Sequence, residues 1–140
     1  MEYIKSGDKI VLRLERGEEI VSSLKKLQRA ENIKGAFFSG IGATDSAVIG
    51  VYAVNDKKYN AVTLTGDMEI AALTGNISVS EDGGEYVHAH VVLGRGEIAH
   101  AGHLNEATVS ATAEIFVQLL DAEIGRKFDP VTGLNVFKLR

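Results

Sequence analysis

The sequence predicts an α+β fold: a mainly antiparallel β-sheet with one principal flanking helix, in a single domain that spans residues 1–140. Many short apolar or alternating segments are separated by turn residues, one segment alone has clear helical spacing, and the chain contains 15 glycines. Apolar residues make up 45% of the 140 residues. A chain of this length and composition can form one packed core without disulfides.

The first two predicted elements are a strand and a helix. Residues 9–15 begin apolar and then alternate, which is typical of a strand. Residues 18–30 carry apolar side chains three and four positions apart, with Glu in the first turn and Lys or Arg toward the end. This spacing predicts an amphipathic helix, and the charges suit the helix dipole. The apolar positions are Ile20, Val21, Leu24 and Leu27.

The middle of the chain predicts a series of short strands. Residues 33–43 form an apolar run that ends in a glycine-rich segment, which is typical of a buried strand. Further predicted strands are 47–54, 59–64, 68–73 and 76–79, with turns at 55–58 and 80–84. Strands at this spacing favour an antiparallel sheet.

Residues 107–120 are compatible with a helix or a strand. Their length and their Ala, Glu and Gln content allow a helix, whereas β-branched residues and apolar alternation from Ala111 to Leu119 favour a strand. We predict a strand. Residues 134–139 alternate weakly and predict a last strand. We expect this apolar tail to dock, with a neighbouring subunit as one candidate surface.

Three histidines in one short window are the most informative residues. His88 and His90 are two positions apart, so in a strand they point to the same face. Residues 94–97, Gly-Arg-Gly-Glu, predict a tight hairpin turn. If Arg95–Gly96 are its two loop residues, His103 lies directly opposite His88. All three imidazoles then share one face of one hairpin.

Three neutral imidazoles on one face suit zinc or a related divalent metal ion, with one coordination position left open. The chain contains no cysteine, so a metal site must consist of His, Asp and Glu. The alternative is structural: histidines that form hydrogen bonds on a sheet face or in a polar pocket. His100 would lie opposite Val91 and point to the other face, so we expect it to be exposed or hydrogen-bonded. A hydrolytic site would also need a nearby carboxylate, for which the candidates are Glu69, Glu85, Glu106 and Glu114.

The glycine-rich segment Ser39-Gly40-Ile41-Gly42-Ala43 superficially resembles a phosphate-binding loop. It lacks the third glycine of a dinucleotide fingerprint and the Gly-Lys-Ser/Thr of a P-loop, and no helix is predicted to follow it. We therefore expect a place where strands approach closely. Gly40 and Gly42 also leave room for a small-molecule ligand, which could lie beside the histidine face.

Charge and hydropathy argue against several other classes of function. The formal net charge is −4 and the basic residues are scattered, which disfavours broad electrostatic capture of nucleic acid. The N-terminus has no apolar secretory region, and no apolar stretch approaches transmembrane length. We expect no membrane partner and a cytoplasmic location. No serine lies in a nucleophile elbow.

Several motifs follow one another along nearly the whole chain: Phe38-Ser39-Gly40-Ile41-Gly42-Ala43, Met68-Glu69-Ile70, Leu73-Thr74-Gly75-Asn76-Ile77, His88-Ala89-His90-Val91-Val92-Leu93, Ala101-Gly102-His103-Leu104 and Thr112-Ala113-Glu114-Ile115. In their order and spacing they resemble the PPC domain (plants and prokaryotes conserved). The resemblance implies an antiparallel sheet with a flanking helix, assembled as a trimer. It also implies metal ligands at the His-x-His and Gly-His-Leu positions, which here are His88, His90 and His103.

Plant members of this family join the domain to an AT-hook, a short Arg-Gly-Arg-Pro-type arm that enters the DNA minor groove. The sequence contains no such arm, and its one proline is Pro130. The chain is thus similar to the stand-alone prokaryotic members, and DNA binding by that route is not implied. We do not expect a nucleic-acid partner.

Three functions follow, in this order. The first is a homotrimeric, metal-binding module with a zinc-like ion at the three-histidine site and a binding or regulatory role. The second is a metal-dependent, hydrolase-like enzyme that uses the open coordination position. The third is DNA binding by the folded domain. A trimer is also expected on physical grounds. One helix cannot cover both faces of an apolar sheet, so contacts between subunits would cover the remaining apolar surface.

Overall fold

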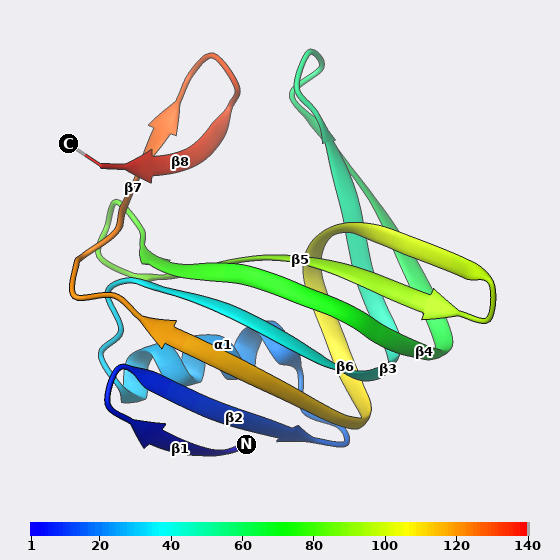
Figure 1. Cartoon of the computed structure of the whole chain (residues 1–140). Coiled ribbons are helices and arrows are strands. Elements are labelled where there is room, and N and C mark those ends of the chain that lie inside the picture. Colours follow the sequence, from blue (N-terminus) through cyan, green and yellow to red (C-terminus); the bar gives the residue numbers. More distant parts are fainter. Residues whose placement is uncertain (140) are drawn as a thin grey trace.

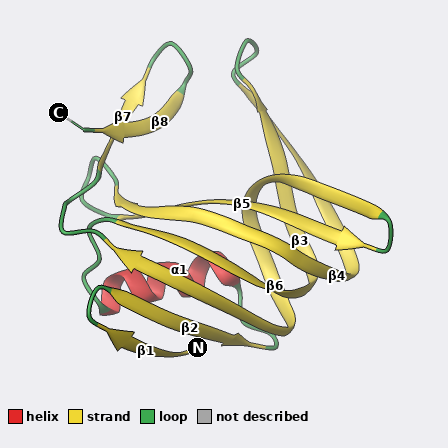
Figure 2. Ribbon diagram, viewed as in Figure 1, coloured by secondary structure: helices red, strands yellow, loops and turns green. Residues whose placement is uncertain are grey.

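One sheet joins the strands of the described chain, and one helix packs against it (Figures 1 and 2). The computed structural model describes residues 1–139. The elements are β1 (Glu2–Ser6), β2 (Lys9–Glu15), α1 (Ile20–Ala30), β3 (Ala36–Ala53), β4 (Lys58–Val79), β5 (Glu85–Arg95), β6 (Ile98–Leu119), β7 (Gly125–Asp129) and β8 (Leu134–Lys138). The α+β fold with one flanking helix is therefore confirmed.

The strand order is β1-β2-β6-β3-β4-β7-β8, and β5 pairs with both β4 and β6. Among residues 1–139, the strand pairings are antiparallel except for a single parallel contact between Val79 of β4 and Gly125 of β7. The first part of β6 pairs with β5, and its later part pairs with β2. Because β3 pairs with both β4 and β6, strands β3 to β6 form a closed cycle of pairings.

Two groups of predicted short strands are each one long strand, so those predicted breaks were wrong. Residues 36–43 and 47–53 of two predicted strands are parts of β3, which begins three residues later than the predicted start at 33, and the three predicted strands between 59 and 79 are parts of β4. The pairing of β3 with β4 shifts register between Gly40 and Gly42, and Gly66 has φ +89°. Glycine tolerates the left-handed conformation at Gly66, and at both places the strands bend through bulges without ending.

The ambiguous segment 107–120 is a strand, as predicted, and forms the later part of β6. The predicted last strand is also confirmed as β8. Strands β1 and β7, of five residues each, were not predicted from the sequence.

The helix packs its apolar stripe against one face of the sheet, which we call the inner face. Ile20, Leu24 and Leu27 are fully buried. Burial of each such side chain contributes roughly 1.5–3 kcal/mol of transfer free energy. The strand residues that alternate into the same core include Ile10, Leu12, Leu14, Ala89, Val91, Leu93, Ala113, Ile115 and Val117.

The helix begins at Ile20, two residues later than predicted, because Glu19 is its N-cap. The Glu19 carboxylate accepts hydrogen bonds from the backbone nitrogens of Val21 (2.8 Å) and Ser22 (2.6 Å), which satisfies two free donors of the first turn. It also accepts from the backbone nitrogen of Ala107 in β6, at 3.1 Å. This one side chain therefore joins the start of the helix to the sheet.

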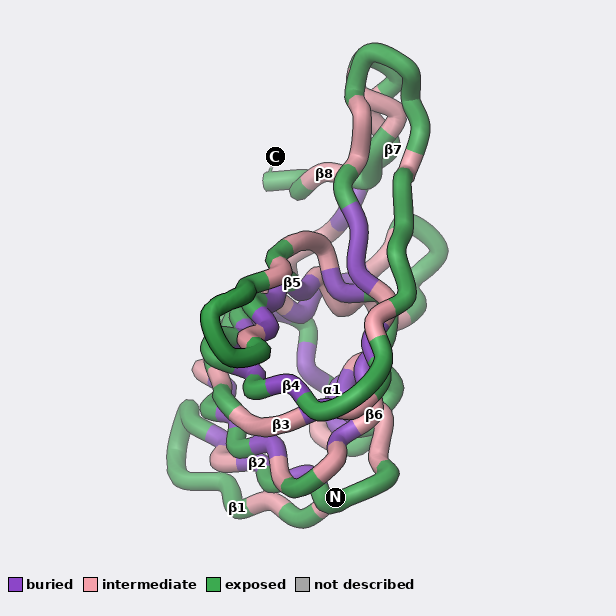
Figure 3. Tube along the Cα trace, turned by 90° about the vertical axis from the view of Figure 1, so that its right-hand side faces the viewer, coloured by how far each residue is buried: buried purple, intermediate pink, exposed green. Residues whose placement is uncertain are grey.

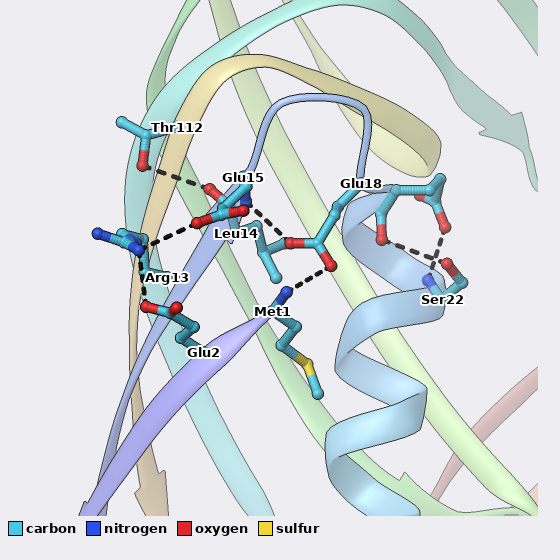
Figure 4. Close-up of polar contacts among 9 residues, drawn as sticks. Met1, Glu2, Arg13, Leu14, Glu15, Glu18, Ser22 and Thr112 are labelled. Atoms are coloured by element: carbon cyan, nitrogen blue, oxygen red, sulfur yellow. Dashed lines mark hydrogen bonds and ion pairs between the residues drawn. The ribbon is translucent and has the colours of Figure 1, made fainter.

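The neighbouring Glu18 connects the same corner to the first two strands (Figure 4). Its carboxylate accepts from the Met1 amino nitrogen at 2.5 Å and from the Glu15 backbone nitrogen at 2.8 Å. Nearby, the Arg13 guanidinium contacts the carboxylates of Glu2 and Glu15 at 2.6 and 3.1 Å. These contacts hold the strand–helix connection against β1 and β2.

Two hairpins extend beyond the main sheet, at the upper right and upper left of Figure 1. We call residues 51–60, at the β3–β4 connection, the tip hairpin, and residues 125–138, which contain β7 and β8, the tail hairpin. Their outer ends are largely exposed (Figure 3).

Two hydrogen bonds connect these hairpins. The Tyr52 hydroxyl donates to the Thr132 carbonyl oxygen at 2.9 Å, and the Lys57 ammonium donates to the Pro130 carbonyl oxygen at 2.7 Å. The two hairpins therefore form an arch beside the sheet. Within residues 1–139, no helix is long and apolar enough to cross a membrane.

Candidate metal centre

Strand β5 carries core residues and histidines on opposite faces. Ala89, Val91 and Leu93 are at most 2% exposed on the inner face. His88 and His90 alternate with them and therefore share the other face, which we call the outer face. The predicted common face of these two histidines is confirmed.

The predicted partner of His103 was wrong by two residues. His103 of β6 pairs with His90, because Arg95 pairs with Ile98 and the two-residue turn is Gly96–Glu97. Gly96 has φ +58°, a left-handed conformation that favours glycine. Since a shift of two residues preserves the side-chain face, His103 still joins the other two histidines.

The three imidazoles lie close enough together to share one ion. One ring nitrogen from each of His88, His90 and His103 can be chosen so that all three lie within 4.8 Å of one another. The ring centroids are 5.0 to 5.6 Å apart. Nitrogens bound to zinc at about 2.0–2.1 Å in a tetrahedral site would be roughly 3.4 Å apart. Binding would therefore draw ring nitrogens that lie up to 4.8 Å apart closer together.

The environment favours neutral imidazoles. Burial lowers the pKa of His88 to about 4, and the positive charges of His103, Arg126 and His90 add to this effect. Burial also lowers the pKa of His103, with a further contribution from His90. A neutral imidazole has the free lone pair that a metal ion requires.

The alternative interpretation is that hydrogen bonds hold these histidines in a purely structural role. In the described chain, no hydrogen-bond partner for their ring nitrogens supports it. The hydrogen bonds within residues 1–139 include none to the ring nitrogens of His88, His90 or His103. The nearby Tyr59 ring meets the His103 ring edge-on, at 5.8 Å between centroids. The Tyr59 hydroxyl donates instead to the Asn105 side-chain oxygen and, at 3.4 Å, to the His103 carbonyl oxygen.

A cavity of about 500 Å³ opens onto the three histidines. Val51, Tyr52 and Tyr59 line it from the tip hairpin, and Leu134 and Asn135 line it from the tail hairpin. The arch between the two hairpins thus covers part of the histidine cluster. A second cavity of about 520 Å³ lies beside His88 and His90 and is lined by Phe37, Asn76 and Phe137, among others.

None of the candidate carboxylates lines either cavity. Glu85 is 3.2 Å from the Arg29 guanidinium. Glu69 and Glu114 line a separate hollow of about 490 Å³ together with Gly42. Glu106 pairs with Val48 in the β3–β6 ladder. The sequence offered four acidic residues for a hydrolytic site, and the fold directs none of them to the histidine cavities.

Strands pack so closely at positions 40 and 42 that only glycine fits there. This confirms the close approach of strands that the sequence predicted for Gly40 and Gly42. A Cβ at Gly40 would come within 2.7 Å of the Glu114 carbonyl oxygen, and one at Gly42 would overlap the Thr112 carbonyl oxygen. The hollow beside Gly42 contains none of the three histidines. That hollow therefore does not border the histidine face, and a small-molecule ligand near Gly40 and Gly42 stays a prediction.

His100 points to the opposite face from the three clustered histidines, as predicted. It pairs with Leu93 rather than Val91, because of the same two-residue shift in the turn. It is absent from the group that could hold an ion.

Arg126, which was not predicted from the sequence, anchors the tail hairpin beside the site. Its side chain is 6% exposed and lies between the rings of Tyr86 and Phe137, with its guanidinium carbon 4.4 and 4.3 Å from their centroids. The guanidinium donates to Ser78 Oγ (2.9 Å), Asn76 Oδ1 (2.6 Å) and the Asn135 carbonyl oxygen (3.0 Å).

Arg126 also shows where the tail docks. Its hydrogen bonds connect β7 to β4 and β8, so the tail docks on its own chain. Asn76, one of its acceptors, pairs directly with His88. The local sequence Gly-Arg-Lys is typical of an exposed segment and does not indicate that Arg126 is an anchor. Its partners Ser78 and Asn76 lie about 50 residues away along the chain, so no local pattern reveals them.

The chain matches a family model over most of its length. Residues 1–121 match the Plants and Prokaryotes Conserved (PCC, also written PPC) domain. No curated protein matches the chain.

Several solved structures are similar over nearly the whole chain. A metal-containing protein from Archaeoglobus fulgidus is 34% identical, with 98% of this chain and 96% of that chain covered and a TM-score of 0.88. A PPC protein from Pyrococcus horikoshii is 34% identical, with 98% and 94% covered and a TM-score of 0.86. A protein from Bacteroides thetaiotaomicron, provisionally named a DNA-binding protein, is 32% identical, with 98% and 96% covered and a TM-score of 0.93. The protein therefore belongs to the Plants and Prokaryotes Conserved domain family.

Proposed function

We propose that this protein binds one divalent, zinc-like metal ion per chain through His88, His90 and His103 and acts as a homotrimeric binding module. The observation that carries the proposal is the convergence of three imidazoles from β5 and β6 on one face. Three neutral imidazoles suit zinc and leave a fourth position open. The metal-containing relative from Archaeoglobus fulgidus supports a metal in this fold.

The trimer is supported by apolar side chains left on the outer face of the sheet. Phe37, Ile41 and Phe116 are 55%, 59% and 63% exposed. They lie on neighbouring strands, because Ser39, between Phe37 and Ile41 on β3, pairs with Phe116 of β6. Exposed aromatic and aliphatic groups of this kind favour a subunit contact. Phe37 also lines the cavity beside His88, so this contact would border the metal centre.

Elemental analysis tests the metal centre directly. The protein, purified without a histidine tag, is expected to contain or take up about one zinc-like ion per chain. His88→Ala and His103→Ala are expected to abolish stoichiometric metal. His100→Ala is the matched control, since His100 lies on the same hairpin but outside the cluster, and it should retain the metal. Full metal content in His88→Ala would refute the assignment.

An enzyme is the second candidate, favoured by the cavity that opens onto the histidines. A metal-bound water could be activated at the open position. A general base would strengthen this reading, but no carboxylate of residues 1–139 lines the cavity. Hydrolysis of ester substrates by the metal-loaded protein, lost in His90→Ala, would move this candidate to first place.

DNA binding is the third candidate, and it is supported by the names of two relatives, from Bacteroides thetaiotaomicron and Ralstonia eutropha. The net charge of −4 disfavours it. Salt-sensitive binding of the purified protein to duplex DNA would support this candidate, and its absence would remove it.

A further inference from the structure

The cavity above the histidines has uncharged walls. Its lining consists of the three histidines, three tyrosines, aliphatic side chains, backbone at two glycines and one asparagine amide; no Asp, Glu, Lys or Arg of residues 1–139 is among them. Tyr52 and Tyr59 face it from the tip hairpin, and Tyr86 faces it from β5. A volume of about 500 Å³ is in the range of small-molecule sites.

A metal ion at this site would keep its full charge. Imidazole ligands are neutral, so three of them leave two positive charges uncompensated. Buried charges are normally balanced by a charge of opposite sign. No carboxylate of the described residues faces the cavity to provide that balance.

Arg126 adds a further positive charge behind the cavity wall. It packs on Tyr86, which lines the cavity, and among residues 1–139 its hydrogen bonds go only to uncharged oxygen atoms. Asn76, one of these acceptors, pairs with His88. The whole region is therefore electropositive once the metal is bound, and the surrounding apolar groups weaken the screening.

We propose that the cavity binds a small organic carboxylate with an apolar or aromatic body. The carboxylate occupies the open coordination position, and the body packs against Val51, Tyr52 and Tyr59. This assignment rests on the proposed metal centre. An inorganic anion would satisfy the charge but leave the apolar walls in contact with water, whereas tyrosine rings suit a planar apolar group.

The test uses the full chain loaded with cobalt(II), whose visible absorption reports a change of ligand, and phenylacetate as the probe. Phenylacetate is expected to change the absorption saturably. Its Kd should be at least about tenfold lower than that of acetate, which lacks the ring, and of phenylacetamide, which lacks the charge. Equal affinity for phenylacetate and phenylacetamide would overturn the proposal, as would tighter binding of inorganic phosphate.

A charge placed on the wall provides the matched variant. Val51→Asp puts a carboxylate at a 65% exposed cavity position and should weaken phenylacetate binding by about tenfold through repulsion. Val62→Asp, at a 50% exposed position outside the cavity lining, should leave it unchanged. Both variants should bind cobalt normally.

The outcomes separate the two proposals. If the protein binds no cobalt, both the metal centre and the carboxylate site are refuted. If cobalt binds but phenylacetate leaves its absorption unchanged, the metal centre stands and the carboxylate site is refuted. An equal loss of phenylacetate binding in both Asp variants would also refute the site.

Discussion

The two faces of the β5–β6 hairpin differ in what their side chains do. On the inner face, Val91 and Leu93 are at most 2% exposed and pack in the core. On the outer face, His88, His90 and His103 line a cavity that the tip and tail hairpins partly cover. Side chains on adjacent positions of one strand therefore belong to different environments. Stability should depend on the inner face, and metal and ligand binding on the outer face.

The largest effect is expected on the inner face. Leu24→Ala removes a fully buried helix side chain and should lower the free energy of unfolding by about 2–5 kcal/mol, because it creates a cavity. Chemical denaturation measures this loss. Metal content per folded chain should remain that of the unmodified protein; a loss of metal in the folded variant would show that the faces are not independent.

Metal loading should act through the outer face alone. Zinc at about one hundred times its Kd is expected to raise the free energy of unfolding by about 2.7 kcal/mol, the increase for a ligand that binds the folded chain alone. His90→Gln should abolish this increase while the metal-free protein unfolds nearly as before, because His90 is exposed. Denaturation curves with zinc and with a chelator check both statements. Zinc stabilisation that persists in His90→Gln would contradict the assignment.

The exposed apolar part of the outer face should control assembly. Phe116→Glu places a charge at a 63% exposed position and should weaken subunit association by at least about tenfold. Light scattering at micromolar concentration should show a trimer for the unmodified protein and smaller species for the variant. Phe116→Leu, which stays apolar, should remain trimeric. A monomeric unmodified protein would overturn the trimer.

The smallest effect is the pH dependence of the metal-free protein. His88 has a pKa of about 4 in the folded state against 6.5 when unperturbed, so the unfolded chain binds the proton more readily. Stability should therefore fall as the pH decreases from about 6.5 to about 4. Because the ring is only partly buried, we expect about 1–2 kcal/mol. His88→Gln should reduce this slope; an unchanged slope would assign the titration to other groups.

The sequence predicted the helix and the shared face of the histidines because both depend on local periodicity. A spacing of three and four residues defines the buried stripe at Ile20, Leu24 and Leu27. A spacing of two places His88 and His90 together. The register error at His103 left the site intact, since it amounted to two residues.

The lengths of β3 and β4 could not be predicted from local periodicity. The glycines in β3 and β4 look like turns, but they mark bulges where neighbouring backbone approaches closely, as Gly42 shows against Thr112. Whether a glycine ends a strand or bends it depends on the strand beside it, and that strand is distant in the sequence.

The sequence alone determined the α+β class, the one helix and the histidine face, because local spacing dictates which side of an element each residue occupies. Only the tertiary structure decided what surrounds that face. It brought the tip and tail hairpins together over the histidines, placed Arg126 beside them and left the four candidate carboxylates outside the cavity. Those arrangements depend on contacts between residues about 50 to 80 positions apart, which no local pattern encodes.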